Sequence, residues 1–321
     1  MARVLITGAS GFVGGHLARA CAAAGDEVIG ASRSGELPDG CGRGLPIDLL
    51  VGAAVRSVIA EERPQVVYHL AVLSSVGRSW EDPVRTVRDN VTTAVNLLEA
   101  LRLEAPDARV LWVSSGEVYG APERLPADES TRVSPANPYA VSKTAGDLLA
   151  GVYAEAHGLD LIRARPFNHA GPGQQPVFIL SSLARQAAEA RLAGAAAVRI
   201  VTGSPDTRRD FTDVRDVVRA HRLLAERAES GVYNIASSRS VSAAEQVALV
   251  RELIAPITVE HVVDPDRVRA HEVMDLRGSH ERLTRATGWE PKISLRQTMA
   301  DTIAFWEGEL ARTGAAEAVR H

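Results

Sequence analysis

A glycine-rich turn between an apolar run and a helical pattern is the feature that most restricts how this chain folds. Residues 3–7 have the continuous apolar character of a buried parallel strand, and Gly8, Gly11 and Gly14 follow at every third position. Glycines at a strand–turn–helix junction let backbone N–H groups approach a pyrophosphate at the helix N-terminus. The turn therefore predicts a dinucleotide site, the alternative being a plain tight turn.

Apolar runs and helical patterns alternate after this turn, which is typical of an α/β fold with a doubly wound parallel sheet. We expect further strands at 27–31, 45–48, 65–71, 110–115, 159–165 and 232–236, and loops at 166–174 and 203–213. The long helical patterns lie at 82–103, 137–157, 241–254 and 295–310. We expect a dinucleotide-binding domain from residues 1–165 plus about 205–238, and a smaller C-terminal substrate-binding domain from about 166–204 plus 239–321.

Composition narrows the functional classes. The net charge is −4 and the arginines are scattered, which argues against a nucleic-acid-binding protein. The apolar start is soon broken by glycine, serine and His16, so it predicts neither a signal peptide nor a membrane span. Cys21 and Cys41 have no metal-ligand spacing and form no disulfide framework, so we expect a cytoplasmic protein without a metal site.

Tyr139 and Lys143 stand four residues apart at the start of a predicted helix, which places both side chains on one face. An ammonium near a phenol favours the phenolate, so we expect Lys143 to lower the pKa of Tyr139 and make it a proton donor and acceptor. The chain has 36 lysines and arginines, of which only Lys143 and Lys292 are lysines. An amine kept beside Tyr139 against this bias favours a catalytic pair over an exposed aromatic next to a solvated charge.

The end of the second strand predicts which dinucleotide binds. Sites that prefer NAD carry an acid there for the ribose 2′-hydroxyl, whereas this chain has Ser32, Arg33 and Ser34. These residues can hold a 2′-phosphate, so we expect NADP(H) as the cofactor. NAD(H) is one alternative, and the simplest alternative for Arg33 is that it is exposed to solvent and binds no cofactor. Asp48, at the end of the third strand, either accepts from the adenine amine or caps the following helix.

Polar residues follow the fourth and fifth strands, whose carboxyl ends face the ligand in a doubly wound sheet. The segment 72–77 is small and polar, suited to lying against cofactor and substrate, while His69 is expected to be a packed strand-end histidine. Ser115 and Glu117 come to the same edge as Tyr139. Ser115 can donate to a substrate oxygen, and Glu117 is either a proton-transfer or hydroxyl-binding group or a solvated loop acid.

Four segments together resemble the extended short-chain dehydrogenase/reductases, the epimerase/dehydratase family that acts on nucleotide sugars. They are Thr7-Gly-Ala-Ser-Gly-Phe-Val-Gly14, Ser114-Ser-Gly-Glu-Val-Tyr-Gly120, Tyr139 with Lys143, and Arg209-Asp-Phe-Thr-Asp213. The segment Asn168-His-Ala-Gly-Pro-Gly-Gln174 is most similar to that of the GDP-4-keto-6-deoxy-D-mannose reductases, although Ala270 stands where the family usually has a proline. The related dehydratases usually continue the Asn-His with Ser-Pro-Arg-Arg.

The resemblance implies reduction of the C4 ketone of a nucleotide-linked 4-keto-6-deoxy sugar by NADPH. It implies that Tyr139 protonates the C4 oxygen, that Ser115 hydrogen-bonds this oxygen, and that Lys143 holds the nicotinamide ribose. The implied cofactor contacts are Gly8, Ser10, Gly11, Phe12, Val13, Gly14, Ser32, Arg33, Asp48, Leu49, Leu70, Ala71, Tyr139 and Lys143. The implied substrate contacts are Ser74, Ser115, Glu117, Asn168, Arg209 and Arg269, with an ion pair to Asp210 or Asp213 as the alternative role of Arg209.

Other functions stay open at this point. A nucleotide-sugar 4,6-dehydratase or 4-epimerase shares these motifs and keeps its dinucleotide through the cycle. A non-catalytic, cofactor-sensing protein on this fold is a more distant alternative, since Tyr139 and Lys143 are both present. The resemblance also implies a homodimer paired through the helices at 82–103 and 137–157, unless these faces only pack on the sheet.

Overall fold

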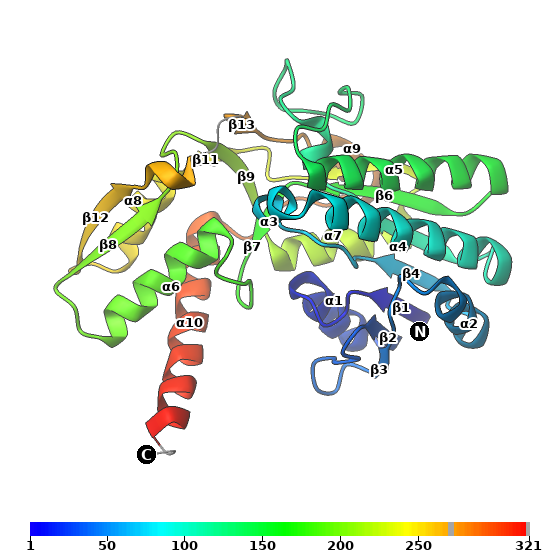
Figure 1. Ribbon diagram of the computed structural model, residues 1–321, viewed down its shortest axis with the longest axis horizontal. Coiled ribbons are helices and arrows are strands. Elements are labelled where there is room, and N and C mark those ends of the chain that lie inside the picture. The colour runs from blue at the N-terminus through cyan, green and yellow to red at the C-terminus, as the bar shows by residue number, and fades with distance from the viewer. Residues whose placement is uncertain (269–272, 319–321) are drawn as a thin grey trace.

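The computed structural model describes residues 1–268 and 273–318, and its centre is a seven-stranded parallel sheet (Figure 1). Each strand pairs in parallel with its neighbours in the order β10-β6-β5-β4-β1-β2-β3. The strands are β1 (Arg3–Thr7), β2 (Glu27–Ser32), β3 (Arg43–Pro46), β4 (Val66–His69), β5 (Arg109–Val113), β6 (Leu161–Pro166) and β10 (Gly231–Ile235). The expected doubly wound parallel sheet is confirmed.

Helices cover both faces of this sheet (Figure 1). Successive residues of a strand point to opposite faces, so Val4 and Ile6 of β1 pack on one side and Leu5 on the other. The first face carries α1 (Phe12–Ala23), α7 (Val214–Arg227) and α9 (Glu281–Thr287), and the second carries α2 (Gly52–Glu62), α4 (Pro83–Glu104) and α5 (Pro138–His157). The short α3 (Val76–Glu81) and η1 (Gly116–Tyr119) follow β4 and β5.

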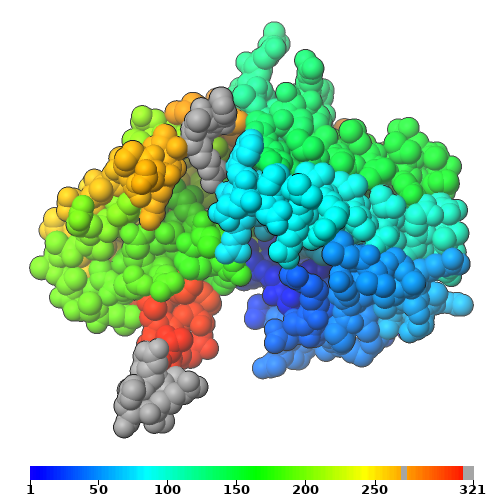
Figure 2. Space-filling model, in the orientation of Figure 1, coloured from blue at the N-terminus to red at the C-terminus, as the bar shows by residue number. Residues whose placement is uncertain are grey.

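A smaller part with its own apolar core lies beside the sheet (Figure 1). It contains α6 (Ile179–Leu192), α8 (Ala243–Leu253), α10 (Leu295–Ala318), and the parallel pair of β8 (Ala197–Thr202) and β12 (Thr258–Val263), followed by η2 (Pro265–Arg267). A second small sheet joins β9 (Arg208–Asp213) to β7 (Asn168–Ala170), β11 (Ser240–Ser242) and β13 (Asp275–Leu276). Figure 2 shows the surface hollowed between the α6 and α10 segments and the dark-blue N-terminal segment.

Three expected element boundaries are wrong. The third strand is β3 at Arg43–Pro46 rather than 45–48, because Arg43 already pairs with Ile29. Residues 203–213 are a loop only in part, since they end in β9, whose Asp210 and Thr212 are buried rather than solvated turn residues. The expected loop 166–174 contains β7, which pairs with β9. Strands β7 and β9 were not predicted because their residues are mostly polar, as in a loop.

Within the described residues, no helix is long and apolar enough to cross a membrane.

Asp216 joins the C-terminal segment to the first turn of α7. Its buried carboxylate accepts from the backbone N–H groups of Lys292 and Ile293 at 2.7 and 2.8 Å and pairs with Arg219 at 2.7 Å. We expect Asp216→Ala to lower the free energy of unfolding by about 3 kcal/mol, because it leaves buried donors without partners. Urea unfolding measures this change.

The control for this prediction is Glu226→Ala on the same helix. It removes an exposed ion pair with Arg222 and should cost less than about 1 kcal/mol. Equal losses of stability in both variants would contradict this role of Asp216.

Candidate active site

The glycine turn between β1 and α1 has the close backbone approaches that a dinucleotide site requires. Gly8 has φ +73°, and a Cβ at Gly14 would lie 2.2 Å from the Gly8 carbonyl oxygen. Gly11 is the N-cap of α1 and brings no side chain over the helix N-terminus. The first N–H groups of α1 are therefore not covered by a capping side chain, as a phosphate-binding helix N-terminus requires. Ser10 is exposed in the turn, and Phe12 and Val13, which begin α1, are partly exposed.

The loop after β4 lies directly against this turn. A Cβ at Gly8 would be 2.9 Å from the Ala71 nitrogen, so the backbone of Leu70 and Ala71 borders the glycine turn. The Thr7 hydroxyl accepts from the Ala71 N–H at 3.3 Å and hydrogen-bonds Nδ1 of His69 at 2.8 Å. His69 is buried, and its pKa is lowered to about 3 by burial and by Lys143, so it is a packed neutral histidine. Ser74, further along the loop, is exposed.

The end of β2 places Arg33 at the surface. Ser32 is buried and its hydroxyl accepts from the Gly35 N–H at 3.0 Å, which fixes the turn that carries the exposed Arg33 and Ser34. Asp48 is exposed next to Leu49, and its carboxylate accepts from the Leu50 N–H at 3.0 Å. Val51 is the N-cap of α2, so the suggestion that Asp48 caps that helix is wrong.

Tyr139, Lys143 and Ser115 meet where α5 starts beside the end of β5. Asn137 caps α5 by accepting from the Ala140 N–H at 2.8 Å, and Pro138 occupies the first turn. Tyr139 and Lys143 follow on the inner face, 8% and 7% exposed, and the Tyr139 phenol hydrogen-bonds the Ser115 hydroxyl. The Lys143 ammonium donates to the Val113 carbonyl. Two hydroxyl groups and one cation are thus gathered at one sheet edge.

Burial dominates the protonation of this group. It raises the pKa of Tyr139 to about 12, while the Ser115 hydrogen bond lowers it and the Glu117 carboxylate raises it. Burial lowers the pKa of Lys143 to about 8, and Asp147 acts in the opposite direction. The expectation that Lys143 lowers the pKa of Tyr139 is therefore wrong, because desolvation of the phenolate prevails. Tyr139 is held as a phenol, a proton donor, across the physiological pH range.

Glu117 is not a freely solvated acid, and its carboxylate acts electrostatically on Tyr139. It lies in η1, half-buried, and accepts from the Asn137 side-chain amide at 3.1 Å. Ser115 is the N-cap of the same η1, and its hydroxyl accepts from the Glu117 N–H at 3.2 Å. Glu117 thereby connects the segment that carries Ser115 to the cap of the helix that carries Tyr139.

Two of the predicted substrate residues lie in the small sheet. Asn168 and Arg209 lie in β7 and β9, which are paired, and both are partly buried. Arg209 Nη1 donates to the Arg208 and Val273 carbonyls at 2.8 and 2.7 Å. Asp213 pairs with Arg215, and Asp210 accepts from the turn at Ser237 and Ser238. Arg269 lies outside the described residues.

The loop after β7 touches the cofactor turn. The ring of Phe12 stacks on His169 with centroids 6.1 Å apart, and His16 hydrogen-bonds the Pro172 carbonyl at 2.9 Å. The loop is held from the other side by Gln174, which donates to the His169 carbonyl at 2.8 Å. The loop expected to bind the substrate is therefore adjacent to the N-terminus of α1.

Sequence reasoning missed Asn90, a polar residue buried in the amphipathic α4. Its side-chain amide accepts from the Leu73 N–H at 2.9 Å and donates to the Ser142 hydroxyl at 2.8 Å, and Ser142 donates to the Tyr139 carbonyl. Asn90 thus ties the loop after β4 to the helix that carries Tyr139. An asparagine within a core-facing helix stripe was the signal that could have revealed it.

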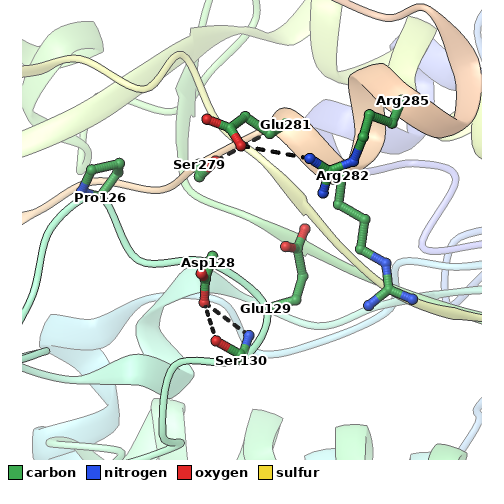
Figure 3. A pocket seen from close by; sticks show the side chains of 8 residues that line it. All are labelled: Pro126, Asp128, Glu129, Ser130, Ser279, Glu281, Arg282 and Arg285. Carbon is green, nitrogen blue, oxygen red and sulfur yellow. Dashed lines mark hydrogen bonds and ion pairs between the residues drawn. The ribbon is translucent and has the colours of Figure 1, made fainter.

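A separate surface cavity of about 360 Å³ contains none of the predicted site residues (Figure 3). Charged side chains line it, from the segment 126–130 and from α9 with the residues just before it. Its wall carries Glu129, whose carboxylate accepts from the Asn234 N–H at 2.8 Å and whose pKa is raised by burial. The residues expected to carry the chemistry follow β5 or lie in the first turns of α5 instead.

Comparisons with known proteins agree with this arrangement. A family model described as GDP-mannose 4,6 dehydratase matches residues 5–302. The GDP-6-deoxy-D-mannose reductase of Pseudomonas aeruginosa is 38% identical over 315 residues, covering 96% of this chain and 98% of that protein. The structure of RMD from Pseudomonas aeruginosa complexed with NADPH has a TM-score of 0.84 at 35% identity, covering 96% of this chain and 100% of the other. The UDP-glucose 4-epimerase of Thermus thermophilus in complex with NAD has a TM-score of 0.84 at 29% identity, covering 95% and 99%.

These similarities extend over nearly the whole chain rather than over the glycine turn alone. The expected resemblance to extended short-chain dehydrogenase/reductases is confirmed by the family model, the sequence relative and the fold. The more specific resemblance to the GDP-linked deoxysugar reductases is confirmed by the 38% identity. The chain therefore belongs to the GDP-mannose 4,6 dehydratase family of extended short-chain dehydrogenase/reductases.

Proposed function

We propose that the protein reduces the C4 ketone of a nucleotide-linked 4-keto-6-deoxy sugar, with GDP-4-keto-6-deoxy-mannose as substrate and NADPH as reductant. The observation that carries this proposal is the buried Tyr139 phenol, hydrogen-bonded to Ser115 beside the Lys143 cation. A tyrosine held protonated suits reduction, which consumes a proton at the carbonyl oxygen. The similarity to a GDP-6-deoxy-D-mannose reductase supports the choice of substrate.

The chain's residues would share the work at the C4 oxygen. Bound NADPH supplies the hydride. Tyr139 donates its phenolic proton to the oxygen, and Ser115, already hydrogen-bonded to Tyr139, donates a hydrogen bond to the same atom. Two donors stabilise the negative charge as it develops, in a site too buried for water to do so. Lys143 would hold the nicotinamide ribose through the N–H donors of its charged ammonium group.

The two domains would differ in the ligand that they mainly bind, although the substrate contacts Ser74, Ser115 and Arg209 lie in the dinucleotide-binding domain. We assign residues 1–165 and about 205–238 to the dinucleotide and about 166–204 and 239–321 to the nucleotide sugar. Gly8 and Gly14 let the backbone pack tightly at the N-terminus of α1, where a pyrophosphate would bind, and Arg33 is exposed where a 2′-phosphate would arrive.

The small sheet would hold the other substrate contacts. Asn168 and Arg209 would contact the substrate diphosphate, together with Arg269, and Ser74 would border the sugar.

Cys21 and Cys41 are buried free thiols, which suits a cytoplasmic protein.

A dehydratase or epimerase is the second candidate, favoured by the family model and by the epimerase with a TM-score of 0.84. Either reaction begins with oxidation, in which Tyr139 must accept a proton before it donates one. A pKa near 12 makes the phenolate scarce at neutral pH, so the first step would need bound ligands that lower this pKa. Such an enzyme would consume no NADPH overall.

The substitution Tyr139→Phe tests the reaction and the role of the tyrosine together. The wild type should oxidise NADPH stoichiometrically when GDP-4-keto-6-deoxy-mannose is made in place by a separate dehydratase. Tyr139→Phe should lose about 10²- to 10⁴-fold in kcat, the usual contribution of a positioned proton donor. Nicotinamide absorbance measures both rates. Tyr153→Phe, on the outer part of α5, is the matched control and should keep the wild-type rate.

Two outcomes would contradict the proposal. An unchanged rate in Tyr139→Phe would remove the tyrosine from the chemistry. Absence of NADPH oxidation by the wild type, with GDP-mannose converted to a dehydrated or epimerised product without added cofactor, would favour the second candidate.

The substitution Arg33→Ala tests the choice of dinucleotide. NADPH has a 2′-phosphate and NADH does not, so the variant should raise the KM for NADPH about 10- to 100-fold and leave that for NADH nearly unchanged. Steady-state kinetics with each dinucleotide measures the difference. Arg3→Ala, at the opposite end of the same strand pair, is the control. Equal changes for both dinucleotides would exclude Arg33 from the 2′-phosphate site.

We further propose that the protein is a homodimer paired through α4 and α5. These helices pack against each other, and both carry exposed apolar side chains. The exposed residues are Val84, Val95 and Leu103 of α4 and Val141, Leu148 and Val152 of α5. Exposed apolar side chains on two adjacent helices are typical of an interface between copies.

The substitution Leu148→Arg should convert the dimer to the 34.2 kDa monomer at micromolar concentration, because it places a charge in the proposed apolar interface. Sedimentation equilibrium measures the mass. Leu192→Arg, at an exposed position of α6, should leave the dimer intact. A monomeric wild type would exclude this assembly.

A further inference from the structure

A buried ion pair lies one helical turn beyond Lys143. Asp147 and Arg165 are 1% and 4% exposed. Two guanidinium nitrogens reach the carboxylate, with Arg165 Nη2 at 2.6 Å from Oδ2 and Nε at 3.2 Å from Oδ1. Asp147 follows Lys143 by four residues on α5, so the carboxylate and the amine share one helix face. The pair therefore sits directly behind the lysine of the proposed active site.

A chain of hydrogen bonds fixes the arginine of this pair. Arg165 Nη1 donates to the Tyr119 hydroxyl at 3.0 Å, and that hydroxyl donates to the Asn234 side-chain oxygen at 2.7 Å. The Asn234 N–H donates to Glu129, which lies on the wall of the surface cavity in Figure 3. The chain runs from the sheet interior to the surface through η1 and β10. Because Arg165 is held in this way, Asp147 cannot turn away from the lysine without breaking the network.

The charges around Lys143 make the carboxylate necessary. His69 of β4 faces the amine but is neutral, and Tyr139 of α5 is a phenol. Arg163 of β6 lies 3.6 Å from Asp147 and adds another positive charge behind it. A buried amine among neutral and cationic groups tends to lose its proton, and a carboxylate nearby opposes that loss.

We propose that Asp147, fixed by Arg165 and Tyr119, is a positioning residue that keeps the Lys143 amine charged within the buried site. The inference rests on the proposed function, since the charged Lys143 amine has a role at the active site only if the protein is that reductase. Asp147 touches neither the substrate nor the cofactor in this scheme and acts through Lys143. The ion pair with Arg165 thus holds the Asp147 charge near Lys143, and it also joins α5 to β6.

The direction of the effect follows from the two influences on Lys143. Burial lowers the pKa of the amine to about 8, and Asp147 opposes that shift. Removing the carboxylate charge should therefore lower this pKa further, and the neutral amine should become common at pH 7. Loss of the charge on Arg165 should do the reverse, because the carboxylate would then face Lys143 without a competing cation.

The small number of lysines makes a direct measurement feasible. The chain has only Lys143 and Lys292, so protein labelled with ¹³C-lysine gives two ε-carbon signals, which Lys292→Arg assigns. Titration of the Lys143 signal gives its midpoint without any substrate or cofactor. Asp147→Asn should lower this midpoint by about one pH unit, the lower end of what a nearby opposite charge contributes. Asp147→Glu keeps the negative charge, so its Lys143 midpoint should stay close to the wild-type value.

A matched control separates this effect from simple loss of an ion pair. Asp160 pairs with Arg109 at 2.6 Å and immediately precedes β6, at the opposite end of that strand from Arg165. Asp160→Asn should leave the Lys143 midpoint unchanged. An unchanged midpoint in Asp147→Asn, or an equal shift in both variants, would overturn the proposal.

Arg165→Met provides an independent test that does not need Asp147→Asn to fold. It should raise the Lys143 midpoint, and a midpoint that stays or falls would overturn the proposal. NADPH oxidation can then be followed as a function of pH. With Asp147→Asn, the alkaline loss of kcat should begin about one pH unit lower than in the wild type. If no NADPH is oxidised at all, the proposed function fails, while the titration still decides the role of Asp147.

Discussion

Desolvation of the first turns of α5 is the constraint on which the site depends. The helix presses Tyr139 and Lys143 against the carboxyl ends of β4 and β5, where both are less than a tenth exposed. In that environment a phenol keeps its proton and an amine tends to lose its own. The fold must therefore supply compensating groups, and it does so with Ser115 at the phenol and Asp147 behind the amine.

The parallel sheet explains how distant residues can meet this need. All seven strands run in one direction, so their carboxyl ends share an edge and the following loops converge there. The Thr7 hydroxyl at the end of β1 contacts His69 and Ala71 at the end of β4. Asn90 then ties the loop after β4 to α5. The end of β1, the loop after β4 and α5 are consequently joined in one hydrogen-bonded network.

The sequence was sufficient for the central sheet and for the residues at its edge. Apolar runs such as β1 are unambiguous because both faces of a parallel sheet are buried. It was insufficient for β9, because a strand with the sequence Arg208–Asp213 has the polarity of a loop, and its charges find partners only in the folded chain. It also misled us about the direction of the Tyr139 pKa shift. Spacing shows that an amine is near, whereas the depth of burial depends on packing among α4, α5 and β5.

Strand β9 shows what polar residues do inside this fold. Asp210 is buried and accepts from the N–H groups of Ser237, Ser238 and Gly278, so one carboxylate joins three points of the chain. Asp213 accepts from Arg215 in α7 and from Thr298 in α10, which joins the part on the sheet to the smaller part. Since side chains alternate along a strand, Arg209 must point away from the side that Asp210 occupies. Because Asp210 is anchored rigidly, its neighbour Arg209 has a defined direction, which the proposed role of Arg209 in substrate binding requires.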